Sequence, residues 1–523
     1  MIPDEEAPGP SRKAEVRAAG LKVGAAAVVA AGLFALYAHE VTVEQQVADL
    51  LAGTRIAGAR AGGARAELNK DTPLGWLSAE EQLGKALDLQ PSNPYAVAAW
   101  ADVQVMLAGA GFSDRAQHAD AAVARADGKD VVLPERYEAR ALLLISAGKA
   151  GEAQAYLSAL LEKYGAVPRL IDVLGRAQRA SGKLEAARQN FKKAQDVDWR
   201  APRYVADYAQ ALLEEGNALE AAQAFDRALQ ANSDHSRAQI GKARALTALV
   251  RLGRGGGDLR AAGALCDAVL AKPAAELPAA LKAKALAARS EARLASADAV
   301  GAGQDAEAAV QVDGKSAAGL RARALVLAEA RDPGAAAAFK AAIAADPYDA
   351  TTYFGGANAL AAAGDSAGSE KLLGASASTL PKSARYHLAL AQILSRRHSW
   401  KDAQGELLKA QRLEPANAQV YFEEGRVAQA QKDVKAATAA YERAARLRDD
   451  FPEVYRQMGA LYLESRNVEA ALKTFNEALA RYKTARTPPP VLEAFYSDVV
   501  AQVSRAGKKK LAKEWVKQAR ALH

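Results

Sequence analysis

The chain is poor in cysteine and in aromatic residues. Its only cysteine among 523 residues is Cys266, so no internal disulfide and no cysteine-based zinc or iron–sulfur site can form. Aromatic residues make up 6% of the chain, and the hydrophobic 50% is dominated by alanine, which buries little area per residue. Thick globular cores are therefore hard to build, although the length alone suggests about three or four domains. Alanine favours closely packed helices instead, because it has the highest helix propensity and lets backbones approach.

A large excess of one charge is also missing. Lys and Arg number 69 and Asp and Glu number 61, which leaves a net charge of +8. This mild excess over a long chain is not by itself the footprint of a nucleic-acid-binding protein. The 25% of charged residues and the ample hydrophobicity exclude a disordered chain.

Long uncharged runs are rare, and one stands near the start of the chain. The run from Val23 to Ala38 has no charge, and with its flanks, residues 23–43, it is adequate for one marginal transmembrane span. A cleaved signal peptide and a buried alanine-rich helix are the alternatives. Basic residues precede the run, which predicts a cytoplasmic N-terminus and an extracytoplasmic body in a bacterial periplasm, with a cytoplasmic body as the alternative. Gly20, Gly24 and Gly32 share one helical face, where two copies of the helix could pack.

A 34-residue period organises the rest of the chain. Bulky residues recur at this spacing in helices that read A-x-x-x-[FYL]-x-x-A, first at Leu157, Phe191 and Phe225, then at Phe339, Leu373, Leu407, Tyr441 and Phe475. Each unit also has an earlier amphipathic helix, in which a small residue at the eighth position lets the two helices touch. Glycine at the fifteenth position, as in Gly182 and Gly216, allows a tight turn between them. A fixed period of this length is typical of stacked helical hairpins.

This pattern resembles the tetratricopeptide repeat (TPR) family, here the membrane-anchored bacterial type, from about residue 60 to the end. The resemblance implies an all-α fold, an α-solenoid in which helical hairpins form a right-handed superhelix with a concave groove. The expected organisation is a cytoplasmic tail (1–22), a transmembrane anchor (23–43), a juxtamembrane linker helix (44–59), an N-terminal repeat block (60–250), degenerate repeats (251–316), a C-terminal repeat block (317–485) and a terminal capping repeat (486–523).

The degenerate repeats depart from the pattern. No aromatic residue occurs from Asp226 through Ala338, and the glycines between Gly253 and Gly257 break the register. Less side-chain area at each interface weakens the coupling between neighbouring repeats. We therefore expect a soft joint at 251–316.

Residues with catalytic or metal-binding spacing are missing. None of the six histidines has the spacing of a metal site. Cys266 and His387 occupy core positions of their repeats, which favours packed side chains over a nucleophile or a ligand. We therefore expect no catalytic residue, no metal and no cofactor, and a protein that is not an enzyme.

The concave groove is the expected binding site. The resemblance implies that positions 2, 5, 9 and 12 of each first helix face a ligand. Those positions predict a peptide-binding groove formed by Phe354, Asn358, Arg385, Gln392, Phe422, Arg426 and Arg456. Two aromatic and several basic groups suit an extended peptide with apolar and acidic side chains. Phe354 and Phe422 have an alternative role, which is to cover the seams between repeats.

The C-terminal helix is distinctly basic, with Lys509, Lys513, Lys517 and Arg520 against Glu514. It either docks to an acidic partner or anionic lipid or is a solvated face. Taken together, the sequence predicts a membrane-anchored scaffold that binds partner proteins or peptides, and no nucleic acid, in bacterial envelope assembly, export or motility machinery. The alternatives are a cytoplasm-facing regulatory adaptor and a self-assembling structural solenoid.

Overall fold

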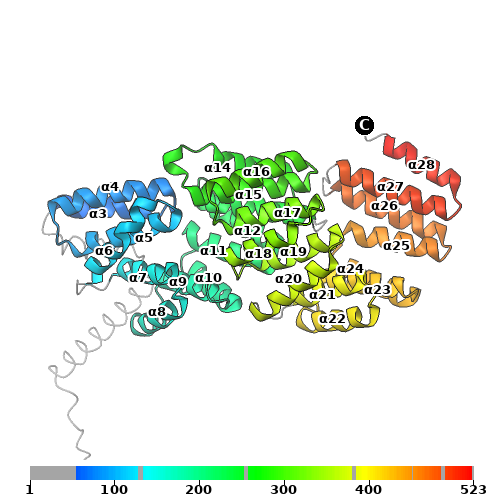
Figure 1. The fold of residues 1–523 in the computed structure, drawn as a ribbon, viewed down its shortest axis with the longest axis horizontal. Helices are drawn as coiled ribbons and strands as arrows, with labels where there is room; N and C mark the ends of the chain where they lie inside the picture. Colours follow the sequence, from blue (N-terminus) through cyan, green and yellow to red (C-terminus); the bar gives the residue numbers. More distant parts are fainter. Residues whose placement is uncertain are drawn as a thin grey trace, which may run out of the picture.

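The computed structural model describes residues 55–127, 133–251, 257–379, 384–449, 451–484 and 489–520, and in these segments all regular structure is helical. Each helix packs against the next, which gives thirteen antiparallel hairpins in the described part of the chain. The hairpins follow one another in sequence order along the molecule (Figure 1). The helices are α3 (Arg55–Leu68), α4 (Pro73–Leu89), α5 (Pro94–Ala110), α6 (Ser113–Asp127), α7 (Pro134–Ser146), α8 (Ala150–Tyr164), α9 (Pro168–Arg179), α10 (Leu184–Val197), α11 (Pro202–Glu215), α12 (Ala218–Ala231), α13 (Ser236–Arg251), α14 (Leu259–Leu270), the 3₁₀ turn η1 (Ala274–Glu276), α15 (Ala279–Ala295), α16 (Ala299–Val312), α17 (Ala317–Glu329), α18 (Ala335–Ala345), α19 (Ala350–Ala363), α20 (Ser366–Thr379), α21 (Ala384–Arg396), α22 (Trp400–Leu413), α23 (Ala418–Ala430), α24 (Val434–Leu447), α25 (Pro452–Glu464), α26 (Val468–Thr484), α27 (Pro489–Arg505) and α28 (Lys509–Arg520).

The turn inside each hairpin is left-handed wherever the structure describes it, which leaves out the turn between α13 and α14. Its residue has a positive φ angle at the predicted fifteenth position, as in Gly182 (78°) and Gly216 (94°). The same conformation recurs at the 34-residue spacing in non-glycine residues, among them His398 (60°), Lys432 (63°) and Arg466 (61°). Glycine adopts this conformation without steric cost, whereas other residues are strained in it.

The bulky residue of each second helix forms the core between hairpins. The predicted set is almost completely buried, with at most 3% of any side chain exposed: Leu157, Phe191, Phe225, Phe339, Leu373, Leu407, Tyr441 and Phe475. Small residues on the first helices make room for these side chains. A Cβ atom on Gly175 would lie 2.7 Å from the ring of Phe191, and one on Gly241 would lie 2.2 Å from the ring of Phe225. The period read from the sequence is therefore a packing period.

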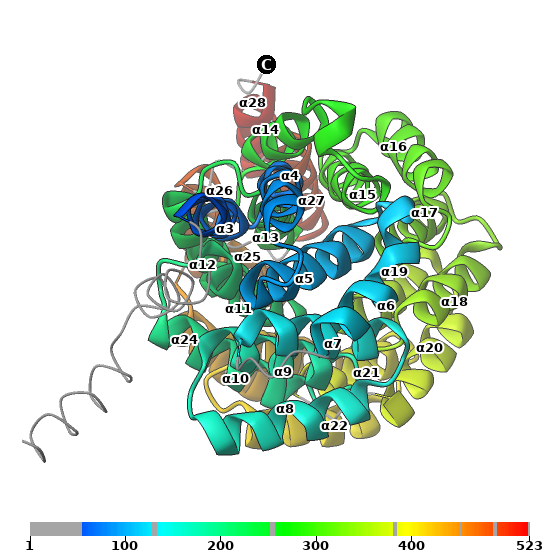
Figure 2. The ribbon, with the colours of Figure 1, turned by 90° about the vertical axis from the view of Figure 1, so that its left-hand side faces the viewer.

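The first nine hairpins, α3–α20, coil far enough that elements distant in sequence touch. Helix α5 contacts α15, and α11 contacts α19. Asn232 donates a hydrogen bond to the carbonyl of Lys70 (2.7 Å), and Gly111 lies against Ala280. Viewed end-on, these helices surround a central axis (Figure 2). We call α3–α20 the closed turn and α21–α28 the C-terminal arm.

The localisation predicted from the sequence is wrong. None of the helices in the described segments is long and apolar enough to cross a membrane. The uncharged run that motivated the prediction has only sixteen residues, about 24 Å of helix against a hydrocarbon core of about 30 Å. The proposed anchor at 23–43 and its glycine face lie outside the described residues. The expected soft joint at 251–316 contains α14, α15 and α16, and it stays a prediction.

Candidate functional site: the interior of the closed turn

A cavity of about 1030 Å³ lies inside the closed turn. Its wall comes mainly from odd-numbered helices, from α5 through α17, with further residues from α4, α6, α10 and α12 and from the segment before α19. Aliphatic side chains such as Met106, Leu142 and Leu281 share this wall with charged ones. The volume is at the upper end of the range for ligand sites, about 300–1,000 Å³.

A chain of buried ion pairs runs beside this cavity, and we call it the charge ladder. It links five successive odd-numbered helices and the α3–α4 turn through Asp102, Arg169, Glu138, Arg203, Asp172, Arg176, Asp207, Arg237 and Asp71. Glu138 receives Arg169 at 2.7 Å on one oxygen and Arg203 at 2.8 Å on the other. The next ion pairs join α9 to α11 and α11 to α13. The ladder therefore connects successive repeats by charge.

The ladder ends at Asp71 in the α3–α4 turn, and Asp71 contacts His235, which lies just before α13. This contact closes the turn. His235 Nδ1 accepts the amide of Ala238 at 3.1 Å, so Nε2 carries the proton and donates to Asp71, 2.9 Å away. Burial alone would raise the pKa of Asp71, but this hydrogen bond and the charge of Arg237 outweigh it and hold the pKa well below its usual range. Asp71 is therefore a carboxylate at neutral pH.

Asp172, another carboxyl group of the ladder, has a pKa that is shifted in the opposite direction from that of Asp71. Burial raises its pKa to about 7, although the guanidinium groups of Arg176 and Arg203 lie 3.2 and 3.4 Å away and favour the charged form. The nearby carboxylates of Asp207 and Glu138 add to the upward shift of the pKa. The ladder thus contains one carboxyl group that titrates near neutral pH.

In a second set of ion pairs, Arg179 with Asp346 crosses from one side of the turn to the other, and the rest join neighbouring repeats. Arg179 binds Glu214 at 2.9 Å and Asp346, on the opposite side, at 3.0 Å. Arg321 binds Glu291 at 2.8 Å and Asp349 at 2.6 Å. These pairs neutralise most of the acidic groups at the centre of the cavity wall.

Besides the exposed Lys315, two cations on the cavity wall have no ion pair among the described residues. Arg244 lies on α13, and its buried Nε has no hydrogen-bond partner there. Lys284 lies on the neighbouring α15, and its side chain is open to the cavity. Enclosure by the surrounding protein and the charges of Arg237 and Arg179 lower the pKa of Lys284, and enclosure and Arg321 lower that of Arg244. The carboxylates of Glu291 and Asp349 act on Arg244, and that of Asp346 on Lys284, in the opposite direction without cancelling these shifts, so an anionic group would stabilise both cations.

The predicted groove residues do not line this cavity. Phe354 and Phe422 are buried, at 4% and 6% exposure, in the seams between repeats, so the structure places them in the alternative role. The guanidinium of Arg385 lies 5.0 Å from the ring centroid of Phe354, and its Nη1 donates to the carbonyl of Glu214 at 2.8 Å. Arg385 therefore ties α21 to the end of α11.

The remaining predicted residues lie on the C-terminal arm and on α19. Gln392 donates to Glu423 at 2.9 Å, and Arg426 pairs with the same Glu423 at 3.0 Å. Arg456 forms an ion pair with Asp498, and Asn358 is exposed. The structure thus brings Gln392 and Arg426 together, as it does Phe354 and Arg385, and leaves the others apart, and the role of these residues in peptide binding stays a prediction.

The sequence contained a signal for the ladder that the groove prediction did not use. Arg169, Arg203 and Arg237 are 34 residues apart, and so are Glu138 and Asp172. Charged residues that repeat with the packing period must share one face of successive first helices, so they can pair along the solenoid.

The two residues expected to pack in the core do so. The Cys266 side chain is fully buried, and burial raises the pKa of its thiol to about 12. His387 is 9% exposed, with Nδ1 2.6 Å from Glu406. Within the described segments, no three His, Cys, Asp or Glu side chains are grouped as they would be to hold a metal ion.

Fold and site together define this chain as an all-α repeat protein, a solenoid of tetratricopeptide-like hairpins with an enclosed interior. No protein-family model matches it, and no curated protein matches its sequence.

Solved structures with a similar arrangement include the yeast Tom70 crystal structure, which is 13% identical and covers 74% of this chain and 96% of its own, with a TM-score of 0.41. The Cut9–Hcn1 hetero-tetramer of the APC/C is 14% identical over 89% of this chain and 99% of that chain, with a TM-score of 0.32. The human IFIT1 dimer with PPP-AAAA is 16% identical over 73% of this chain and 90% of that chain, with a TM-score of 0.40.

Proposed function

We propose that this chain is a non-enzymatic repeat adaptor that holds a short segment of a partner protein inside the closed turn. The observation that carries the proposal is the cavity of about 1030 Å³, whose wall combines aliphatic side chains with the cations Arg244 and Lys284. This proposal corresponds to the regulatory adaptor that the sequence offered as an alternative to the membrane-anchored scaffold. The role in bacterial envelope machinery stays a prediction.

The chemistry of the wall favours a peptide over a nucleic acid. Single-stranded nucleic acids are held by aromatic rings on which bases stack. The aromatic side chains along this wall, Trp76, Phe191 and Phe225, are buried at 7%, 3% and 1% exposure and present no open ring face. An apolar segment with one or two acidic side chains fits both the aliphatic surface and the two cations.

Site-specific photo-crosslinking in cells tests the proposal. A photoreactive residue at Met106, inside the cavity, should give discrete adducts with a peptide segment, whereas one at Val300, which is 75% exposed on the outside of α16, should not. Filling the cavity with Ala318→Trp should remove the Met106 adducts. Adducts of equal yield at Val300, or RNA in place of peptide at Met106, would overturn the proposal.

The two cations supply a second arm of the test. The double variant Arg244→Gln with Lys284→Gln should reduce adduct formation at Met106 about tenfold, because a charged hydrogen bond contributes about 1.5–3 kcal/mol. Lys282→Gln changes an exposed lysine on the same helix that does not line the cavity, and it should have no effect.

A further inference from the structure

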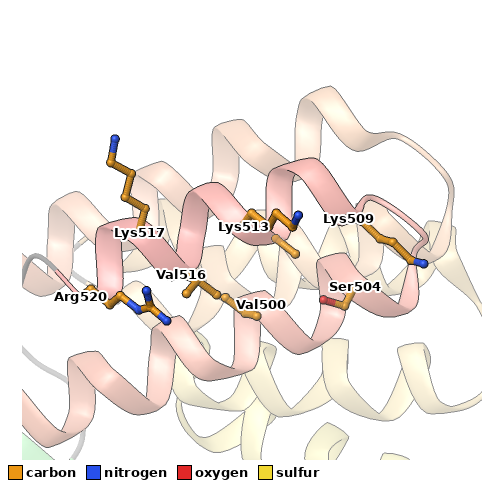
Figure 3. Close-up of a pocket in the computed structure, with 8 residues that line it drawn as sticks. Val500, Ser504, Lys509, Lys513, Val516, Lys517 and Arg520 are labelled. Carbon is orange, nitrogen blue, oxygen red and sulfur yellow. The ribbon is translucent and has the colours of Figure 1, made fainter.

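A second candidate site lies at the last hairpin of the described chain. An open groove of about 540 Å³ lies between helices α27 and α28. Val500 and Val516 face each other across its floor (Figure 3). Lys509 and Lys513 lie along the groove and Arg520 at the opposite end, so an apolar floor is bordered by cations (Figure 3).

The floor of this groove corresponds to the buried core of every earlier hairpin. Val516 follows Ala512 by four residues and precedes Ala519 by three, which is the register of Phe475 between Ala471 and Ala478. Phe475 is completely buried, whereas Val516 and Val500 are only partly covered within the described segments. The last hairpin therefore presents a docking face of the kind that the other hairpins use.

Earlier hairpins show what covers such a face. The bulky residue is closed over by the next first helix, which approaches through a small residue. A Cβ atom on Gly356 of α19 would lie 2.8 Å from the ring of Phe339 on α18, and Gly241 of α13 covers Phe225 of α12 in the same way. The shape of the groove therefore fits one amphipathic helix with a small residue at the contact.

The cations around the groove favour a docking helix that carries negative charge. Lys509, Lys513 and Lys517 follow one another at four-residue spacing, an arrangement of like charges that destabilises a helix by about 0.2–0.5 kcal/mol per pair. These lysines and Arg520 are exposed and form no ion pair with any described residue, although Arg481 on the preceding α26 pairs with Asp449 at 2.6 Å. A helix with acidic flanks would relieve this repulsion.

A second copy of this chain is a poor occupant. Head-to-tail stacking would bring the first described helix, α3, onto the groove, and this helix has a single acidic residue, Glu67, in its last turn. It therefore lacks the acidic side chains that would match the cations of the groove. We propose that the α27–α28 groove docks an acidic amphipathic helix of a partner protein, which takes the place of a further first helix.

The test uses a synthetic probe and the full chain. The probe is a fluorescent amphipathic peptide with an alanine- and leucine-rich face flanked by glutamates, and the matched control peptide has glutamines instead. Anisotropy titration should show binding of the glutamate peptide and affinity weaker by about tenfold or more for the glutamine peptide.

Charge-reversal variants locate the site. Lys513→Glu with Lys517→Glu should lower the affinity about tenfold or more, while Lys508→Glu with Lys510→Glu, the same change in charge outside the groove, should leave it within about twofold. Arg520→Gln is the milder variant if the double reversal disturbs α28, which circular dichroism would show. Equal loss in both double variants, or equal binding of the two peptides, would overturn the proposal. It would also be overturned if the probe failed to bind while phosphatidylserine vesicles or a second copy of the chain bound through Lys513 and Lys517.

Discussion

The closed turn and the C-terminal arm share one repeat period but are held together by different forces. In the closed turn, buried ion pairs such as Arg169 with Glu138 join successive first helices. In the arm, aromatic rings join successive hairpins: Phe422 lies 4.9 Å from Phe451, and Phe475 lies 6.2 Å from Trp515, measured between ring centroids. Ion pairs leave charged groups beside an interior space, whereas aromatic side chains fill the space between helices. The closed turn therefore combines a cavity of about 1030 Å³ with buried charges, whereas the arm has the open α27–α28 groove of about 540 Å³ with exposed lysines.

The largest expected effect comes from breaking the ladder at its centre. Arg203→Met removes one of the two arginine partners of both Glu138 and Asp172, so two buried carboxyl groups lose part of their compensation, and it should destabilise the closed turn by about 3–5 kcal/mol. Hydrogen exchange should show lost protection in α7–α13 and unchanged protection in α25–α28, because each repeat contacts mainly its neighbours. Equal loss in both regions would show that the two are one cooperative unit.

In the C-terminal arm, the variant that corresponds to Arg203→Met is Phe475→Ala. Phe475 is completely buried and its ring contacts Trp515, 6.2 Å away between centroids, so its truncation should cost about 3–5 kcal/mol. Protection should fall in α25–α28 and persist in α7–α13. Exchange that accelerates first in the closed turn would contradict the division into two regions.

A pH effect should be confined to the closed turn. The pKa of Asp172 is raised to about 7 in the folded protein from 3.8, so folding favours its protonated form. Its contribution to stability is fully present below pH 4 and is lost as the pH rises to about 7. The expected loss is on the order of 4 kcal/mol, and Asp172→Asn should reduce the slope in α7–α13, where burial also raises the pKa of Glu215 to about 7. A slope of unchanged size in the Asp172→Asn variant would assign the effect to another group.

The smallest effect concerns the turns that both regions share. Lys432 has a φ of 63°, which strains a residue with a side chain, so Lys432→Gly should stabilise the arm by about 0.5–1 kcal/mol. Gly182→Ala, at a φ of 78° in the closed turn, should destabilise by a similar amount. Thermal melts of the two variants check the sign. A lower melting temperature for Lys432→Gly would show that its side chain makes a stabilising contact.

The sequence was enough to predict the features that recur in every repeat. It was not enough to predict the features that depend on the arrangement of many repeats together. Bulky core positions such as Phe225 and the turn at Gly182 follow from contacts within a hairpin or between neighbours, so one period reveals them. Closure of the turn depends on small rotations that accumulate over several hairpins. The pairing of Arg179 with Asp346, 167 residues away, is therefore invisible in the period.

The groove prediction missed the interior for the same reason. It assigned position 5 of a first helix to ligand binding, but Phe354 and Phe422 lie in the seams where consecutive first helices meet. In a solenoid with an open groove, the face of the first helix that carries position 5 would be exposed. In a solenoid as tightly coiled as the closed turn, the same face forms inter-repeat contacts and ion pairs, and the accessible interior is left to residues such as Arg244 and Lys284.

The most direct test of the account is a disulfide across the closed turn. A Cβ atom on Gly111 would lie 3.5 Å from that of Ala280, at the near limit of the range of about 3.5–4.5 Å in disulfides. The double variant Gly111→Cys with Ala280→Cys, in a Cys266→Ala background, should form the bridge under mild oxidation of the native protein. Because Gly111 has a φ of 106°, which strains a residue with a side chain, a native circular dichroism spectrum of the reduced variant is the control. With that control met, a bridge that appears only after denaturation, or not at all, would show that α5 and α15 do not meet and that the turn is open.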